Sequence, residues 1–222
     1  MKEKIIDLTH PIYEGMMIFP VSWHPATKVE QLGRHGIENR ETRKVTIGTH
    51  CGTHIDAPRH FIPNGDTLDE ISLDVLVGSA HMIDFSAAAP HQQMEIKDFK
   101  DQLGNERPRR LVLRFDWSDH WGTMNFYNDQ PYISEDAGQW LVDRGVKLLA
   151  MDTPQVDNPE HGRNGPKDSP LHKLMLGKGV IFLESLTNLK LISKNVFELI
   201  ALPLPIRCSD GAPCRAIAIE KT

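Results

Sequence analysis

Short apolar runs alternate with amphipathic segments along the chain. Apolar residues at 94, 96, 99 and 103 recur near a period of 3.6 and predict a helix over 94–103 that ends at Gly104. Ser134 is a favourable N-cap before two acidic residues, and Gly145 is a typical stop. A second helix is therefore expected over 135–144.

Runs rich in β-branched and other apolar residues predict short strands around these helices. Strands alternating with helices are typical of the α/β class. The chain has 222 residues and shows neither a linker nor an internal repeat, so a single domain, 1–222, is expected. The strands are predicted at 5–8, 44–48, 75–85, 111–115, 146–151, 180–183, 199–204 and 216–219.

Two segments show neither the helical period nor the apolar runs of a strand. Glycines and prolines are spread through residues 13–40, which are expected to form an irregular N-terminal arm. Residues 152–169 are rich in Pro, Gly, Asn and Asp and show no periodicity. A long irregular segment inside a compact domain is typical of a binding or lid loop.

Composition excludes several classes of protein. Hydrophobic residues make up 40% and charged residues 25%, as in ordinary globular proteins. The longest apolar runs are far shorter than a membrane-spanning helix, and the N-terminus lacks the apolar stretch of a secretory signal. A net charge of −5 disfavours nucleic-acid binding. Three cysteines are too few for a disulfide framework, so a cytoplasmic location is expected.

The most informative segment contains three histidines and an aspartate at positions of the same parity: His50, His54, Asp56 and His60. In an extended chain their side chains share one face. A straight strand would separate His50 from His54 by about 13 Å, which is too far for one ion. Gly52 allows a tight turn. We therefore expect His50, His54 and Asp56 to converge on one cation.

Imidazole and carboxylate ligands suit Zn²⁺, and also Mn²⁺ or Fe²⁺. The alternative is that these histidines are surface or core residues with local hydrogen bonds. Farther along the chain, His172 follows Pro170, and Glu184 ends an apolar run. Taken alone, Glu184 is expected at a solvent-exposed strand end, and spacing alone does not bring either residue to the first cluster.

The segment 50–60, HCGTHIDAPRH, resembles the HxGTHxDxPxH signature of the cyclase family of metal-dependent hydrolases. That family includes bacterial kynurenine formamidases and isatin hydrolase. The resemblance continues through 151–154, 172–189, 202–204 and 210–215 and so covers most of the chain. It implies a swivelling β/β/α barrel-like fold, a homodimer or homotetramer, and a site with one or two metal ions.

Carried onto this sequence, the resemblance implies that His50 and His54 bind the first ion. Asp56 would touch both ions, and His172 and Glu184 would bind the second. His60 would donate and accept a proton while metal-activated water attacks a small aromatic formamide such as N-formylkynurenine. A cyclic amide, an imide or a lactone is the alternative substrate.

Some positions depart from the family pattern. Phe19, before Pro20, and the nearby Trp23 stand where the family carries an aromatic substrate-binding residue, although packing is an equal alternative. Gln155 replaces an expected serine, and Cys51 an expected threonine. Both changes concern the substrate rather than the metal ligands.

Two other functional classes compete with the metal hydrolase. In one, Cys51 is a nucleophile assisted by His54 or His60; in the other, the protein binds metal without catalysis. Outside the cluster, the remaining histidines are expected to be ordinary surface or core residues: His10, His24, His35, His81, His91, His120 and His161.

Overall fold

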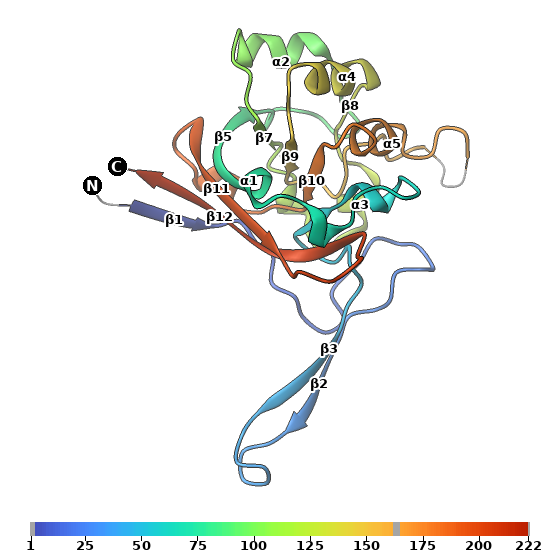
Figure 1. Ribbon diagram of the computed structural model, residues 1–222, viewed down its shortest axis with the longest axis vertical. Coiled ribbons are helices and arrows are strands. Elements are labelled where there is room, and N and C mark those ends of the chain that lie inside the picture. Colours follow the sequence, from blue (N-terminus) through green and yellow to red (C-terminus); the bar gives the residue numbers. More distant parts are fainter. Residues whose placement is uncertain (1–2, 162–164, 222) are drawn as a thin grey trace.

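The computed structural model describes residues 3–161 and 165–221. Its main sheet has the strand order β1-β12-β11-β5-β7-β9-β10-β4, and β4 also pairs with β12. Seven strands therefore close into a barrel, and β1 extends the sheet outside it (Figure 1). The strands are β1 (Glu3–Asp7), β4 (His54–Asp56), β5 (Val77–Asp84), β7 (Arg110–Arg114), β9 (Leu148–Met151), β10 (Ile181–Glu184), β11 (Val196–Pro203) and β12 (Gly211–Lys221).

The short strand β4 closes the barrel by pairing antiparallel with two strands. Against β10, His54 lies opposite Glu184. Against β12, Asp56 lies opposite Gly211. The other neighbour of β10 is β9, which is parallel to it, and β5, β7, β9 and β10 all run in one direction. This topology brings residues 54–56 beside residue 184, which is distant in sequence.

Helices and short 3₁₀ turns connect the strands. α2 and α4 lie together beside the barrel, and α5 packs on α4 (Figure 1). The helices are α1 (Leu73–Leu76), α2 (Ile96–Leu103), α3 (Met124–Asn128), α4 (Glu135–Asp143) and α5 (Pro170–Leu176). The 3₁₀ turns are η1 (Pro58–His60), η2 (Leu68–Glu70), η3 (Trp117–His120) and η4 (Leu189–Leu191).

Both faces of the central strands are buried. In β7, Leu111 and Leu113 belong to the core cluster that packs on the helices, whereas Val112 belongs to the second cluster. In β9, Leu149 belongs to the cluster that packs on the helices, and Leu148 belongs to the second cluster. Side chains that alternate between two apolar environments explain why these strands are continuous apolar runs in the sequence.

The α/β, barrel-like fold expected from the sequence is confirmed. Helix α4 begins as predicted, since the Ser134 hydroxyl accepts a hydrogen bond from the Ala137 N–H at 3.2 Å. Gly104 and Gly145 follow the two predicted helices with positive φ values of 53° and 88°. None of the helices among the described residues is long and apolar enough to span a membrane.

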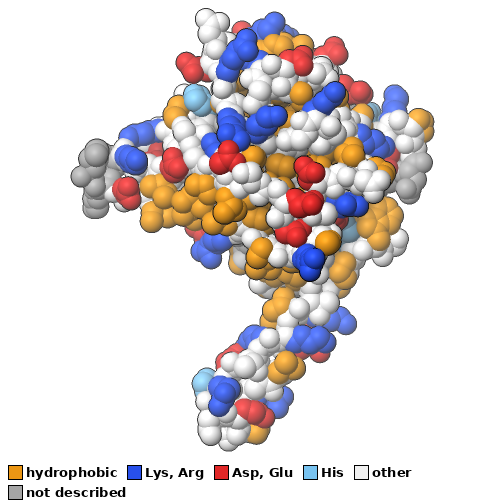
Figure 2. Space-filling model, viewed as in Figure 1, with side chains coloured by type: hydrophobic (Ala, Val, Ile, Leu, Met, Phe, Trp, Pro, Cys, Tyr) orange, Lys and Arg blue, Asp and Glu red, His pale blue; other side chains and the backbone are white. Residues whose placement is uncertain are grey.

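The prediction of a wholly irregular arm over 13–40 was wrong. Strand β2 (Lys28–Gly33) lies within it and pairs with β3 (Thr42–Thr46), which begins and ends two residues before the predicted strand. This hairpin projects from the barrel as an arm with mixed charges (Figures 1 and 2). Most of its side chains are exposed, so neither strand carries the apolar alternation that a buried face would require.

Other strand boundaries also differ from the prediction. Residues 75 and 76 belong to α1 rather than to β5. Strand β12 extends well beyond 216–219, because its first residues pair with β4. A second small sheet, β6 (Gln93–Met94) with β8 (Tyr132–Ile133), was not predicted. These elements are too short to show a period.

Candidate metal centre

A tight turn leads into the first half of the site. Gly52 adopts a φ of +64°, a conformation that side-chain-bearing residues rarely adopt, and so confirms the predicted turn. The next residue, Thr53, fixes the turn, since its hydroxyl donates to the Ser185 carbonyl at 2.6 Å and accepts from the His10 N–H at 3.0 Å. His54 to Asp56 then continue as β4, and all three residues are buried.

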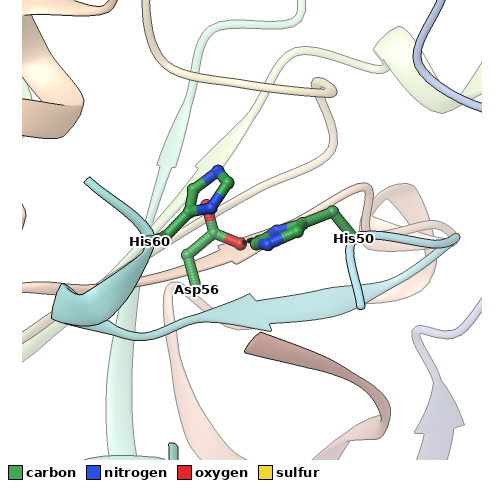
Figure 3. A group of neighbouring side chains, drawn as sticks. All are labelled: His50, Asp56 and His60. Carbon is green, nitrogen blue, oxygen red and sulfur yellow. Dashed lines mark hydrogen bonds and ion pairs between the residues drawn. The ribbon is translucent and has the colours of Figure 1, made fainter. Parts of the chain in front are cut away.

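Asp56 lies at the centre of the site with 1% of its surface exposed. Its Oδ1 atom is 2.7 Å from Nδ1 of His50 and 3.2 Å from Nε2 of His54. Its Oδ2 atom is 3.6 Å from Nε2 of His172. Figure 3 shows the Asp56 carboxylate facing the rings of His50 and His60, which come from the loops on either side of β4. His50 and His54 therefore both contact the same carboxylate oxygen of Asp56.

The two residues from the distant part of the chain reach the same centre. Glu184 Oε2 lies 3.6 Å from Nε2 of His54, and Oε1 lies 3.4 Å from Nε2 of His172. Glu184 is buried rather than solvent-exposed, which corrects the expectation for that residue taken alone. Its Oε1 atom has no hydrogen-bond partner among the described residues, so a buried carboxylate oxygen points into the centre unsatisfied.

Two of the imidazoles are oriented by acceptors behind them. His54 Nδ1 donates to the Gly52 carbonyl at 2.8 Å, and His172 Nδ1 donates to the Asp157 carboxylate. A ring that carries its proton on Nδ1 presents an unprotonated Nε2. Both Nε2 atoms face Asp56 and Glu184, as metal-binding imidazoles do when their outer nitrogen is held by an acceptor.

His50 is arranged differently. Its Nδ1 contacts Asp56, and its Nε2 lies 2.8 Å from Oδ2 of Asp210. The same Asp210 oxygen lies 3.3 Å from Nδ1 of His60, and the His50 and His60 rings stack with centroids 3.8 Å apart. His50 would therefore have to give up one carboxylate contact to bind an ion. Asp210 was missed as a site residue, although it begins the 210–215 motif.

The pKa values show how strongly these groups depend on one another. Burial alone would raise the pKa of Asp56, but the charges of His50 and His60 hold it well below its usual 3.8. Burial and the charge of Asp56 raise the pKa of Glu184. Burial opposes protonation of His50, yet Asp56 and Asp210 together raise its pKa to about 10. Two buried carboxylates therefore attract positive charge, either as protons or as a cation.

The donor set suits a divalent cation. Ligand atoms of His54, Asp56 and Glu184 lie within 4.8 Å of one another, and all three residues are buried. A second such group contains His50, Asp56 and His60. Imidazole nitrogens mixed with carboxylate oxygens are the ligands of Zn²⁺ and of related transition metals. The unsatisfied Glu184 oxygen is the observation that most directly favours an ion here.

Comparisons with known proteins identify the family of this chain. The model of the "Putative cyclase" family matches residues 6–158. This chain belongs to the putative cyclase family. It is 32% identical to a kynurenine formamidase of Bacillus cytotoxicus over 96% of this chain and 95% of the relative. A kynurenine formamidase of Bacillus cereus is 30% identical over the same shares.

Solved structures show the same fold. Isatin hydrolase A from Labrenzia aggregata, bound to benzyl benzoate, superposes with a TM-score of 0.88 at 25% identity, covering 99% of this chain and 94% of that one. A potential metal-dependent hydrolase with cyclase activity gives 0.79 at 25% identity over the full length of both chains. The chain is therefore a metal-dependent hydrolase of the putative cyclase family, as the sequence predicted.

In this member of the family, an aromatic pocket opens beside the metal centre. Phe19 and Trp23 both line it, together with Tyr127, which the sequence analysis missed. Phe19 packs edge-on against Tyr127 with centroids 5.7 Å apart and also touches the core, so it both packs and lines the pocket. Trp23 is 62% exposed at the rim.

The long loop expected to bind ligand also contributes to the pocket. Gln155, Asn158 and His161 line it. His24 also lines the pocket, with its ring parallel to that of His50 at 6.0 Å. His24 and His161, which were expected to be ordinary surface or core histidines, thus lie at the pocket. Neither has a sequence pattern that marks it, because each belongs to an irregular segment.

Cys51 points away from the metal centre. Its thiol is buried against Thr27, at 3.5 Å from Oγ1, and Met16, at 3.7 Å from Sδ. Burial raises the pKa of the Cys51 thiol. A nucleophilic cysteine needs a lowered pKa, so this environment disfavours a cysteine hydrolase.

Proposed function

We propose that this metal-dependent amide hydrolase cleaves the formamide group of a small aromatic substrate of the N-formylkynurenine type. The observation that carries the proposal is the meeting of His54, Asp56, His172 and Glu184 beside an aromatic pocket. The formamidase relatives support the choice of an arylformamide. The pocket supports it independently, because Phe19 and Tyr127 offer flat apolar surface to an aromatic ring.

We propose Zn²⁺ as the ion, in one or two positions, with Mn²⁺ as the alternative. His50, His54 and Asp56 would hold the first ion. Asp56, His172 and Glu184 would hold the second. A bound ion of this kind polarises a carbonyl oxygen and lowers the pKa of a bound water to about 7.

His60 is the group proposed to move the proton. It lies at the edge of the centre, and Asp210 contacts its Nδ1. Burial lowers the pKa of His60 below 6.5, so the ring is neutral at pH 7 and able to accept a proton. His60 takes this proton from the attacking water and delivers it to the amine nitrogen as the C–N bond breaks. Phe19 and Trp23 orient the aromatic part of the substrate during this transfer.

Hydrolysis of a cyclic amide, an imide or a lactone is a second candidate. The likeness to isatin hydrolase A, with a TM-score of 0.88, favours it. Both reactions use the same metal centre and proton carrier, so only the pocket distinguishes them. Gln155 and Asn158 also line that pocket and would meet the non-aromatic part of a substrate.

Metal analysis and a set of hydrolysis assays on one purified sample distinguish these functions. Purified protein is analysed for metal, then assayed with an arylformamide, a cyclic amide and a lactone, before and after chelation. Fastest turnover of the arylformamide, lost on chelation and restored by Zn²⁺, is the expected result. Faster turnover of the cyclic amide would favour the second candidate. Failure of the whole panel with metal-loaded protein would favour a non-catalytic metal-binding protein.

We further propose a homodimer or homotetramer in the cytoplasm. Exposed Ile12, Leu202 and Leu204 line an apolar groove, which is typical of a surface that another chain covers. The three cysteines are free thiols, as expected in a reducing compartment. Light scattering of the purified protein tests the oligomeric state.

A further inference from the structure

We propose that Asp157 is a positioning residue that holds His172 in the orientation needed to bind the second metal ion. Asp157 comes from the long loop after β9, outside every motif that marks the metal ligands. The inference rests on the proposed function, since it takes His172 as a ligand. It adds a residue whose carboxylate acts on the centre through His172.

The buried carboxylate of Asp157 accepts hydrogen bonds from three N–H groups. Asp157 is 2% exposed. Its Oδ1 accepts from the backbone N–H of Leu171 at 2.8 Å, and its Oδ2 accepts from the backbone N–H of His172 at 3.2 Å. The same Oδ2 also accepts from Nδ1 of the His172 ring. Asp157 therefore ties the backbone of His172 and its side chain to a single point.

Helix α5 needs a partner from elsewhere at its start. Pro170 occupies the first turn and has no N–H. Ser169, the N-cap residue, has a φ of 48° and makes no side-chain cap hydrogen bond. The N–H groups of Leu171 and His172 would therefore be left unpaired in a buried environment, which costs about 1–3 kcal/mol for each such group. Asp157 satisfies both.

The ring contact decides which nitrogen faces the centre. With the Nδ1 proton directed at Asp157, Nε2 is the nitrogen that faces the centre, 3.4 Å from Glu184 and 3.6 Å from Asp56. His54 is held in the same way, but by the neutral carbonyl of Gly52. A carboxylate in that place makes an imidazole a stronger ligand as well as an oriented one.

Asp157 itself is held in place by its neighbours. The backbone carbonyl of Val156 accepts from the Ile133 N–H in β8 at 3.3 Å. The carbonyl of Asp157 accepts from the Gln130 side chain at 3.5 Å. Farther back in the loop, the carbonyl of Thr153 accepts from the Ser185 N–H at 3.0 Å. These contacts tie the backbone around Asp157 to segments outside the loop, so the carboxylate is preorganised.

Zinc titration of metal-free D157N protein tests the inference. Asparagine keeps the volume, but its amide N–H₂ would face a donor where a carboxylate oxygen now accepts. Calorimetry should show two Zn²⁺ ions bound by the wild-type protein. In D157N the affinity for the second ion should fall by about 10- to 100-fold, while the first stays within about twofold.

D98N is the matched control. Asp98 Oδ2 accepts from the Glu95 N–H at 2.7 Å in the cap of α2, and Asp98 does not line the pocket, so its loss removes a capping carboxylate without touching a ligand. D98N should bind both ions as the wild type does. Equal losses of second-ion affinity in D98N and D157N would overturn the inference, as would unchanged affinity in D157N.

A second measurement detects the His172 proton in the wild-type protein and uses H172Q only to assign the signal. In the zinc-loaded wild type, the Nδ1 proton of His172 should give a far-downfield NMR signal that H172Q removes. Absence of that signal would overturn the inference. A wild-type protein that binds only one Zn²⁺ would instead refute the two-ion function and the inference with it. Two ions with unchanged binding in D157N would refute the inference alone.

Discussion

Gly211 is the residue at which a single methyl group should damage the metal centre most selectively. It begins β12 and pairs with Asp56 across the closing edge of the barrel. A Cβ atom added there would lie 2.6 Å from the Ile55 carbonyl oxygen and 2.9 Å from Cε1 of His50. Non-bonded heavy atoms are at their optimum near 3.5–4.0 Å, so β4 and β12 must separate by roughly 1 Å.

The size of the effect of Gly211→Ala follows from that displacement. Overpacking of this kind costs about 1–3 kcal/mol of folding stability. In a chain of this length, that corresponds to a melting temperature lower by about 2–12 °C. Moving His50 by roughly 1 Å should reduce turnover by about 100-fold. Calorimetric melting, zinc titration and the arylformamide assay measure the three effects.

Gly179→Ala separates the local effect from general destabilisation. Gly179 has a φ of +73°, so alanine costs about 1–2 kcal/mol there, but nothing lies within 4 Å of the added Cβ. Gly179→Ala should have a lower melting temperature than the wild type and the same affinity for zinc. If Gly211→Ala binds zinc and turns over substrate as the wild type does, the closeness of β12 to His50 is irrelevant to the site and the reasoning is refuted.

Three further predictions test other parts of the account. His60→Ala should retain metal but lose about 10²- to 10⁴-fold in kcat; near wild-type turnover would exclude a proton-transfer role. Cys51→Ala should keep its activity and its sensitivity to chelators, whereas an inactive variant would support a mechanism in which Cys51 is the nucleophile. Burial lowers the pKa of His10 to about 4, so the protein should lose stability as the pH falls from 6.5 towards 4. His10→Gln should flatten that part of the pH–stability curve measured by denaturant titration, and an unchanged curve would contradict it.

Local signals predicted well the parts of the fold that depend on local chemistry. Ser134 and Gly145 bound the α4 helix because capping and a left-handed stop act within a few residues. Gly52 and the parity of residues 50–60 likewise predicted the turn that gathers His50 and Asp56. Hairpin β2–β3 was not predicted, because its strands bury little surface and therefore show no alternation of apolar and polar residues.

The second half of the site depends on long-range pairing. Glu184 lies opposite His54 because β10 and β4 are antiparallel neighbours. The spacing of these residues along the chain does not indicate how the two strands pair. Only the family resemblance indicated it in advance. Asp157 and Asp210 were missed for a related reason: each is a single carboxylate in an irregular segment, and its histidine partner lies 15 or 150 residues away.

The central claim is that two distant stretches of chain hold a cation together. Metal analysis of the purified wild type beside Asp56→Ala tests it most directly, because Asp56 contacts ligands from both stretches. The account predicts one or two equivalents of zinc or manganese in the wild type and a nearly empty, correctly folded variant. Full metal occupancy in Asp56→Ala would contradict it.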